Sequence, residues 1–248
     1  MKCLIVLPCF NEEENVKSLV CSIDQVLKPH IAYEIIAVND GSFDRTGEVL
    51  KILSADYPIR ICEHASNMGL GSALRTGLLA AADESNRDDF VVIMDSDNTH
   101  NPKHVLDMLL AAKDADVVVG SRYVRGGMQM NVPIHRVVLS KGINILVGRL
   151  FLLGVRDATS GFRCFRAKLV KQLRDTFKSS IIESRGFVAS LELLLKAVRI
   201  GGAVKEIPIL LDYGKKGGAS KMRLVSTVYA YLILILKYRR PNDLKRLG

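Results

Sequence analysis

The sequence predicts one α/β domain with a mostly parallel sheet flanked by helices. Short apolar runs rich in Val and Ile alternate with segments whose apolar residues recur at helical spacing. The length of 248 residues suits one well-buried domain and is short for two. Because alternating strands and helices connect by right-handed crossovers, this order is typical of a nucleotide-binding α/β sheet.

Each element follows from its local pattern. Continuous apolar runs predict strands buried on both faces at Cys3–Leu7, Glu34–Val38, Ile59–Glu63, Phe90–Met94 and Val117–Gly120. Helical spacing of apolar residues predicts helices at Asn15–Val26, Thr46–Ala55, Gly69–Ala82 and Pro102–Ala112. No linker or repeat divides the chain. The second half, from about Val124, is basic and rich in glycine, and we expect it to elaborate the same domain.

The net charge limits the classes of partner, and the cysteines indicate whether disulfides or a zinc site are expected. The chain has 35 basic and 26 acidic residues, a net charge of +9, which favours phosphates, nucleic acid or an acidic membrane surface. No nucleic-acid module or regular aromatic–basic alternation is present, so we expect no nucleic-acid partner. The five cysteines are scattered without a C-x-x-C pair. Reduced thiols in a cytoplasmic protein explain them better than a zinc site or disulfides.

Two apolar segments bear on membrane contact. The first residues do not resemble a signal peptide, and no apolar run reaches the ~20 residues of a spanning helix. Val137–Val155 is apolar but interrupted by polar residues, which suits an interfacial helix. Leu224–Leu236 leads into the basic run Lys237–Arg240, a pairing that can dock to anionic headgroups. A core helix with a basic C-terminal cap explains this second segment equally well. We therefore divide the chain into a domain at 1–222 and an amphipathic helix with a basic tail at 223–248.

Polar clusters follow three of the predicted strands, at Pro8–Glu13, Asn39–Ser42 and Asp95–Asn98. Ligands of such sheets bind beyond the carboxyl ends of the strands, so we expect the three clusters to meet at one edge. Asp95 and Asp97, two positions apart, can converge on one hard divalent ion such as Mg²⁺ or Mn²⁺. An Asp-rich turn is the simpler alternative.

The first two clusters also permit two explanations each. Asp40 can hydrogen-bond a base or ribose, and Ser42, Asp44 or Thr46 can cap the following helix; the two roles are compatible. Phe10 can pack near a base, and Glu12 belongs to an acidic group at a helix start, where it complements the helix dipole.

Taken in order, these motifs resemble family 2 glycosyltransferases of the GT-A fold. The shared motifs are Pro8-x-Phe10-Asn11-Glu12, Asn39-Asp40-Gly41-Ser42-x-Asp44-x-Thr46, Asn67-x-Gly69 with Ala73–Gly77, and Met94-Asp95-x-Asp97. Five further motifs resemble the dolichol-phosphate mannosyltransferases and their bacterial polyprenyl-phosphate relatives: Gly120-Ser121-Arg122, Asp157-x-Thr159-Ser160-Gly161-Phe162-Arg163, Gly186-Phe187 with Glu192, Ile207-Pro208, and Gly218-x-Ser220-Lys221. The similarity extends from about residue 3 to residue 222.

The resemblance implies an inverting, metal-dependent transfer of a sugar, with mannose from GDP-mannose as the best guess, to a polyprenyl or dolichyl phosphate. It assigns nucleotide-sugar binding to Pro8, Phe10, Glu12, Asp40, Asp95, Lys215 and Lys221. It assigns Mg²⁺ or Mn²⁺ binding to Asp95, Asp97 and Thr99. It assigns catalytic roles to Asp97, Arg122, Arg136 and Ser140, with the last two on the acceptor phosphate.

Two departures from the family pattern stand out. The family usually has a glutamine metal ligand at the position of Thr99, and an arginine at the position of Lys215 in the loop that closes over the donor. Threonine offers one oxygen, and lysine keeps the charge but loses the bidentate geometry of arginine.

The implied chemistry needs no general base, because a lipid phosphate is already anionic. The site must align two anions and neutralise the leaving diphosphate with the metal and with Arg122, Arg136, Lys215 and Lys221. We expect the protein to act peripherally at the cytoplasmic face of a membrane, on the lipid surface itself or through a small membrane subunit.

Two other functions stay open. A family 2 transferase acting on a hydroxyl of a glycan, peptide or small molecule would need a base, for which Asp157 and Glu183 are the candidates. A non-catalytic subunit that keeps the fold is permitted by Thr99 and Lys215. A dinucleotide oxidoreductase is disfavoured, because no G-x-G-x-x-G follows the first strand.

Overall fold

A computed structural model describes residues 1–151, 153–216 and 224–238 of the chain. Its first half contains β1 (Lys2–Cys9), α1 (Val16–Leu27), β2 (Ala32–Asp40), α2 (Thr46–Leu53), β3 (Ile59–His64), α3 (Leu70–Glu84), β4 (Phe90–Ile93), α4 (Lys103–Ala111) and β5 (Val117–Ser121). The five strands and four helices predicted for this half are confirmed, with ends that differ by a few residues. The boundary predicted at residue 222 falls outside the described residues.

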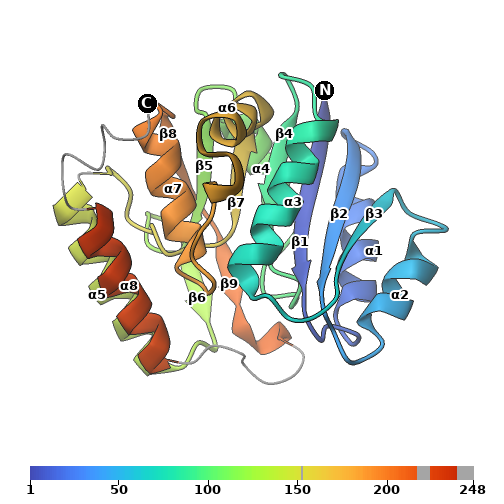
Figure 1. Cartoon of the computed structure of the whole chain (residues 1–248), viewed down its shortest axis with the longest axis horizontal. Helices are drawn as coiled ribbons and strands as arrows, with labels where there is room; N and C mark the ends of the chain where they lie inside the picture. The colour runs from blue at the N-terminus through green and yellow to red at the C-terminus, as the bar shows by residue number, and fades with distance from the viewer. Residues whose placement is uncertain (152, 217–223, 239–248) are drawn as a thin grey trace.

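The second half adds β6 (Met128–Met130), α5 (Ile134–Phe151), β7 (Arg163–Arg166), α6 (Ala167–Phe177), η1 (Lys178–Ser180), α7 (Ala189–Arg199), β8 (Val204–Pro208), β9 (Leu210–Asp212), η2 (Tyr213–Lys215) and α8 (Leu224–Tyr238). The main sheet has seven strands in the order β3-β2-β1-β4-β7-β5-β8, and helices cover both of its faces (Figure 1). A separate pair is formed by β6 and β9. The predicted α/β class with a mostly parallel sheet is confirmed.

One strand of the main sheet runs against the others. β7 lies between β4 and β5 and pairs with both in the antiparallel sense, and its first residue, Arg163, lies opposite Ile93 and Val119. The residues that precede β7 therefore emerge at the same edge as the residues that follow β4 and β5. This reversal brings two distant stretches of sequence to one place.

The core lies in two layers, one on each face of the sheet. Successive residues of β1 alternate between them: Leu4 and Val6 pack in one layer with α3, and Ile5 and Leu7 pack in the other with α1. Since both faces of a central parallel strand are buried, the strand reads as an unbroken apolar run.

The N-terminus of α3 approaches the segment before α7 very closely. The Gly71 amide donates to the Arg185 carbonyl at 2.9 Å, and a Cβ at Gly71 would lie 1.6 Å from the Ser184 carbonyl oxygen. Only a residue without a side chain fits there. The position of the 184–187 segment thus depends on this glycine.

Helices α5 and α8 lie at one end of the molecule (Figure 1). Ile143 of α5 and Tyr231 and Leu234 of α8 pack into the same core layer, while other apolar side chains of both helices remain exposed. Among the described residues, no helix is both long and apolar enough to cross a membrane.

Candidate functional site

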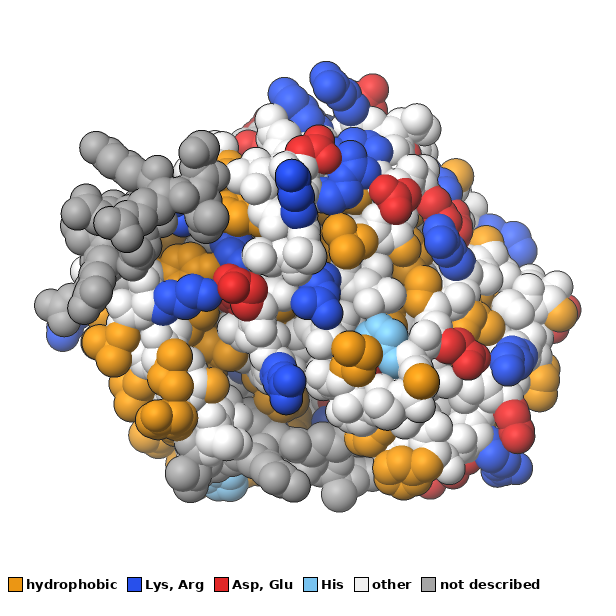
Figure 2. All heavy atoms as spheres, in the orientation of Figure 1, with side chains coloured by type: hydrophobic (Ala, Val, Ile, Leu, Met, Phe, Trp, Pro, Cys, Tyr) orange, Lys and Arg blue, Asp and Glu red, His pale blue; other side chains and the backbone are white. Residues whose placement is uncertain are grey.

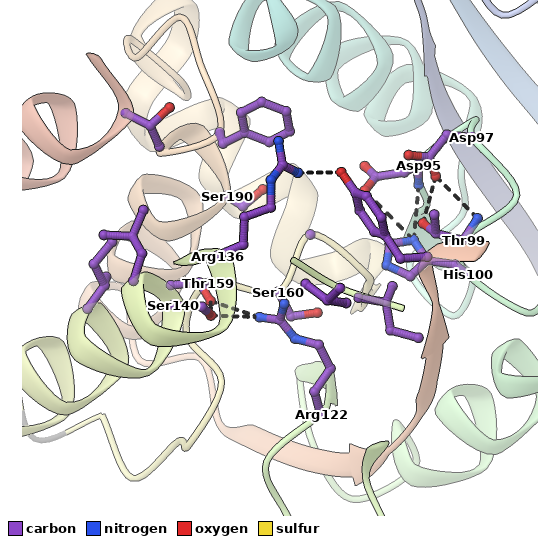
Figure 3. A pocket seen from close by; sticks show the side chains of 18 of the residues that line it. Asp95, Asp97, Thr99, His100, Arg122, Arg136, Ser140, Thr159, Ser160 and Ser190 are labelled. Atoms are coloured by element: carbon purple, nitrogen blue, oxygen red, sulfur yellow. Dashed lines mark hydrogen bonds and ion pairs between the residues drawn. The ribbon is translucent and has the colours of Figure 1, made fainter. Parts of the chain in front are cut away.

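A pocket opens at the sheet edge where β4 and β5 end and β7 begins (Figure 3). Its walls come from the segment after β4, α5 and the segments on either side of it, the start of α7, η2 and α8. Figure 3 shows Asp95, Asp97, Thr99 and His100 on one side, and Arg122, Ser140 and Thr159 on the other. We call the first group the acidic wall and the second, together with Arg136, the basic wall.

The two aspartates of the acidic wall differ in their surroundings. The Asp97 side chain is 12% exposed, accepts from the Thr99 hydroxyl at 2.6 Å, and pairs with the Lys216 ammonium at 2.5 Å. The Asp95 side chain is 36% exposed, and its Oδ2 lies 3.9 Å from His100 Nδ1. Asp95 is therefore the more accessible carboxylate, and Asp97 already faces a cation.

Their protonation reflects these neighbours. Although burial opposes ionisation, the Lys216 ammonium and the Thr99 hydroxyl hold the pKa of Asp97 below its usual value. Burial and the adjacent Asp97 carboxylate raise the pKa of Asp95. Two close carboxylates of this kind gain from a cation placed between them.

His100 completes the acidic wall and has no role in the sequence analysis. Its ring stacks on Phe162 with centroids 4.7 Å apart, and its Nδ1 accepts from the Asp95 amide at 3.4 Å. The imidazole thus supports the turn that carries both aspartates. A single histidine beside an Asp-rich turn gives no local signal for this contact.

The basic wall is built on a two-point ion pair. Arg122 Nε donates to one oxygen of Asp157 at 2.7 Å, and Nη2 donates to the other, also at 2.7 Å. Despite burial, this pairing holds the pKa of Asp157 below its usual value and raises that of Arg122. Bidentate pairing of this kind fixes the plane of the guanidinium.

Ser140 joins this pair to α5. Its hydroxyl accepts from Arg122 Nη2 at 3.2 Å and from the Tyr123 hydroxyl at 3.0 Å, and it is hydrogen-bonded to Thr159 at 2.9 Å. The structure thus brings the predicted residues Arg122 and Ser140 together. Thr159 belongs to the same network but was not predicted as a site residue.

Arg136, the remaining residue of the basic wall, contacts η2. Its guanidinium donates to the Tyr213 hydroxyl and lies 5.4 Å from the centre of that ring. Lys216 Nζ lies 5.4 Å from the same ring. Neither Tyr213 nor Lys216 was predicted. Lys215, which was predicted, is exposed and does not line the pocket. Lys221 lies outside the described residues.

Of the residues predicted to bind the nucleotide-sugar, Asp95 lines this pocket, whereas four others lie at or just after the ends of β1 and β2 and do not line it: Pro8, Phe10, Glu12 and Asp40. The three polar clusters do meet at one edge, as expected, because the Ser96 hydroxyl donates to the Pro8 carbonyl at 3.0 Å and the Asn11 amide donates to Ser42 at 3.0 Å. Nucleotide contact by Pro8, Phe10, Glu12 and Asp40 stays a prediction.

Three of these four side chains already have local partners. The Asp40 carboxylate accepts from the amides of Met68 and Gly69, both at 2.9 Å, and so shapes the turn before α3. Glu12 accepts from Asn15 at 2.7 Å. Phe10 meets Phe43 edge-on with centroids 5.7 Å apart, and Phe43 is largely exposed.

Arg163 lies fully buried behind the basic wall. It donates to the carbonyls of Ala158 and Ser190, and its Nε has no partner among the described residues. Burial lowers its pKa to about 10, so the guanidinium is charged at neutral pH. In the described part of the chain no carboxylate forms an ion pair with it, so it adds positive potential behind the pocket.

The acidic wall fits a hard divalent cation. Asp95 and Asp97 offer oxygen ligands from one turn, as Mg²⁺ and Mn²⁺ prefer. Across the residues that the structure describes, no three His, Cys, Asp or Glu side chains converge on one point. A cation there would need oxygens from its ligand, and metal binding by Thr99 stays a prediction.

The structure argues against both candidate general bases. Asp157 is fully buried and both of its oxygens accept from Arg122. Glu183 pairs with Lys196 at 3.3 Å and Lys237 at 2.9 Å, and it does not line the pocket. Neither carboxylate is placed to remove a proton from a bound hydroxyl.

Comparison with known proteins gives one family match and several similar proteins. Residues 4–174 match the model of glycosyl transferase family 2. The dolichol-phosphate mannosyltransferase of Pyrococcus furiosus is 34% identical over 94% of this chain and 62% of its own length. The polyprenol monophosphomannose synthase of Mycolicibacterium smegmatis is 34% identical over 88% of this chain and 80% of its own. The chain thus spans less than two thirds of the first of these relatives.

Among solved structures, glucosyl-3-phosphoglycerate synthase from Mycobacterium tuberculosis superposes with a TM-score of 0.67. The alignment covers 96% of this chain and 79% of that one at 19% identity. That structure contains Mn²⁺, UDP and glucosyl-3-phosphoglycerate, and another of the same protein contains Mg²⁺ and UDP. At this identity the match concerns the fold.

Proposed function

The chain belongs to glycosyl transferase family 2, and we propose that it transfers mannose from GDP-mannose to a polyprenyl phosphate with inversion at the sugar. The GT-A fold expected from the sequence is confirmed by the solved relative. The observation that carries the proposal is one pocket with a pair of carboxylates on one wall and arginines on the opposite wall.

The acidic wall would hold the donor. A divalent cation on Asp95 and Asp97 would neutralise the diphosphate as it leaves. The turn beyond β4 presents both carboxylates to the pocket, and His100 supports that turn through the Asp95 amide. Pro8, Phe10, Glu12 and Asp40 remain our candidates for the nucleotide, since their segments lie at the same sheet edge.

The basic wall would hold the acceptor phosphate. Asp157 balances the charge of Arg122, and Arg136 at the wall and Arg163 behind it add further positively charged groups. Ser140 and Thr159 offer hydroxyls beside Arg122. Such pre-oriented charges and dipoles align a phosphate for attack without further reorganisation.

An anionic acceptor explains why no free base is needed. Both candidate bases are held in ion pairs, whereas a phosphate oxygen can attack the anomeric carbon directly. Attack from the basic wall would approach the sugar opposite the diphosphate held at the acidic wall. This arrangement corresponds to single displacement with inversion.

A peripheral membrane position fits the exposed apolar side chains of α5 and α8. Figure 2 shows hydrophobic side chains gathered at the end of the molecule where these helices lie. We call this set the apolar surface; it comprises Ile134, Val138, Ile145, Leu146 and Leu150 of α5 and Tyr229, Leu232, Ile233 and Leu236 of α8. Exposed Lys141, Arg149 and Lys237 accompany it, which suits an anionic lipid surface. The remainder of the predicted basic tail lies outside the described residues.

The pocket and the apolar surface share the same two helices. Leu139 and Ile143 of α5, and Thr227 and Tyr231 of α8, line the pocket. A lipid phosphate delivered at this end of the molecule would therefore be close to the basic wall. A membrane partner subunit covering the same surface is the alternative to direct lipid contact.

The test is transfer of radiolabelled mannose from GDP-mannose with Mn²⁺, offered polyprenyl phosphate or a hydroxyl acceptor in parallel. We expect label only on the lipid phosphate, and loss of transfer with EDTA and in Asp97→Asn. Label found only on the hydroxyl acceptor would refute the proposal. Absence of transfer together with absence of metal-dependent nucleotide binding would favour a non-catalytic subunit.

A further inference from the structure

Tyr213 and Lys216 connect the two walls of the pocket. Lys216 pairs with Asp97 of the acidic wall, and Tyr213 accepts from Arg136 of the basic wall. The ring of Tyr213 has both cations near it, with each charged group 5.4 Å from its centre. We call the four residues Asp97, Lys216, Tyr213 and Arg136 the coupling chain.

The segment that carries Tyr213 is hydrogen-bonded to the acidic wall and to the residues just before α5. The Asp212 amide donates to the Thr99 carbonyl at 3.2 Å, next to the acidic wall. The Asp212 carboxylate accepts from Gly214 at 3.0 Å and from Asn131 at 3.1 Å, just before α5 begins. A short, hydrogen-bonded element therefore lies between the two walls.

Lys216 occupies the place on Asp97 that a cation of the donor complex would take. Its ammonium lies 2.5 Å from Asp97 Oδ2 and is largely buried there, and Asp97 raises the pKa of Lys216 although burial opposes this. A divalent ion and an ammonium repel each other strongly at such separations. A divalent ion on Asp97 would therefore repel Lys216 from its present position.

We propose that the coupling chain makes acceptor binding depend on the donor: arrival of the metal and nucleotide displaces Lys216 from Asp97, which loosens Tyr213 and frees Arg136 for the acceptor phosphate. The inference rests on the proposed function and adds to it the residues that link the two binding sites. Because coupling between two ligands is reciprocal, the acceptor also strengthens nucleotide and metal binding by the same factor. Tyr213 and Lys216 act here as positioning residues.

The main test measures binding of a short-chain isoprenyl phosphate by calorimetry, alone and with saturating GDP and Mn²⁺. We expect GDP and Mn²⁺ to tighten this binding about fivefold or more in the unaltered protein. In Tyr213→Phe, which lacks the hydroxyl that Arg136 contacts, the enhancement should fall close to one while the affinity for GDP and Mn²⁺ alone is retained. An enhancement of equal size in Tyr213→Phe would overturn the inference.

A second variant addresses Lys216 directly and does not depend on turnover. Free Mn²⁺ is followed by electron paramagnetic resonance while the protein is titrated without nucleotide. Lys216→Met should bind Mn²⁺ several-fold more tightly than the unaltered protein, since the competing ammonium is gone. Lys205→Met, which removes an exposed lysine of β8, is the matched control and should leave Mn²⁺ affinity unchanged. Equal affinities in all three proteins would refute the competition.

These results separate the inference from the proposed function. If isoprenyl phosphate and GDP with Mn²⁺ each bind but show no coupling, only the coupling chain is refuted. If isoprenyl phosphate does not bind under any condition, the acceptor assignment itself fails. Thermal melting of each variant verifies that it is folded before binding is compared.

Discussion

Arg122 and Asp157 meet through two hydrogen bonds of 2.7 Å, with the carboxylate completely buried and the guanidinium nearly so. The Arg122 amide also donates to Asp157, at 3.0 Å. The pair therefore fixes both the side chain and the backbone at the point where β5 leads into the pocket. It is a structural support of the basic wall as well as part of its charge.

Removing the carboxylate should cost much of the stability of the domain. In Asp157→Asn the guanidinium remains buried without its counter-charge, and breaking such a pair typically costs about 3–5 kcal/mol. We expect the free energy of unfolding, measured with urea, to fall by an amount in this range. A loss below about 1 kcal/mol would show that water or another acceptor replaces Asp157.

The Arg122–Asp157 pair also predicts that the stability of the folded protein depends on pH. The pKa of Asp157 is depressed in the folded protein. The ionised carboxylate therefore contributes its full stabilisation above the pKa of an unfolded aspartate, about 4, and this stabilisation is lost as the pH falls through the pKa of the folded state. The difference in melting temperature between the unaltered protein and Asp157→Asn should therefore be constant near neutrality and narrow below about pH 4. A difference that widens on acidification would contradict this assignment.

Replacing glycine by alanine should have opposite effects on stability at two positions, Gly71 and Gly142. In Gly71→Ala the new Cβ would lie 1.6 Å from the Ser184 carbonyl oxygen, so the 184–187 segment would have to move away. We expect the free energy of unfolding to fall by about 1–3 kcal/mol or more. Gly142→Ala lies on exposed α5 with nothing within 4 Å and should stabilise by up to about 1 kcal/mol. Urea unfolding of both variants tests the pair. Similar effects would show that the close approach at Gly71 is absent in solution.

If position 99 belongs to the metal site, Thr99→Gln should increase the affinity for Mn²⁺. Thr99 stands where the resembling family usually has a glutamine ligand, and its hydroxyl now donates to Asp97 at 2.6 Å. Thr99→Gln should offer a carbonyl oxygen to the cation and tighten Mn²⁺ binding in the presence of GDP by roughly tenfold. Calorimetry with Thr99→Ala as the matched control measures this. Equal affinity in both variants would remove position 99 from the metal site.

The apolar surface predicts lipid binding. Ile233→Asp or Leu236→Asp should lower the partition onto vesicles of anionic phospholipid by roughly tenfold, since each places a charge where an apolar side chain would be buried. Ile52→Asp is the control, because Ile52 is 69% exposed on α2 and lies outside this surface. Cosedimentation gives the bound fractions. If all variants bind like the unaltered protein, lipid does not contact this surface.

The sequence predicts the first half of the fold well; in the second half it indicates the helices α5 and α8 but not the strands. Strands such as β1 and β4 are buried on both faces, and this makes them unbroken apolar runs that any window detects. β7 reads Arg-Cys-Phe-Arg, and β8 contains Lys205 and Glu206. Their pairing partners are set by tertiary contacts, so their local sequence carries little strand signal.

Some residues of the candidate site could likewise be identified from the sequence and others could not. Asp95 and Asp97 could be identified because they follow directly after a clear strand. Lys216 contacts Asp97 from 119 positions away, and Tyr213 contacts Arg136 from 77 positions away. Lys216 lines the pocket and its neighbour Lys215 does not. The turn of η2 decides this, and composition alone does not define that turn.

The order of the two walls along the chain has an evolutionary consequence. The pocket-lining carboxylates of the acidic wall come from residues before 101 and the arginines of the basic wall from residues after 121, so each wall is encoded by one contiguous part of the gene. Recombination within β5 could then replace the wall for one substrate while leaving the other unchanged. Lys216 is the exception, since it is encoded with the arginines but pairs with Asp97. A hybrid enzyme would inherit a matched lysine and aspartate only if both parents had kept that pair.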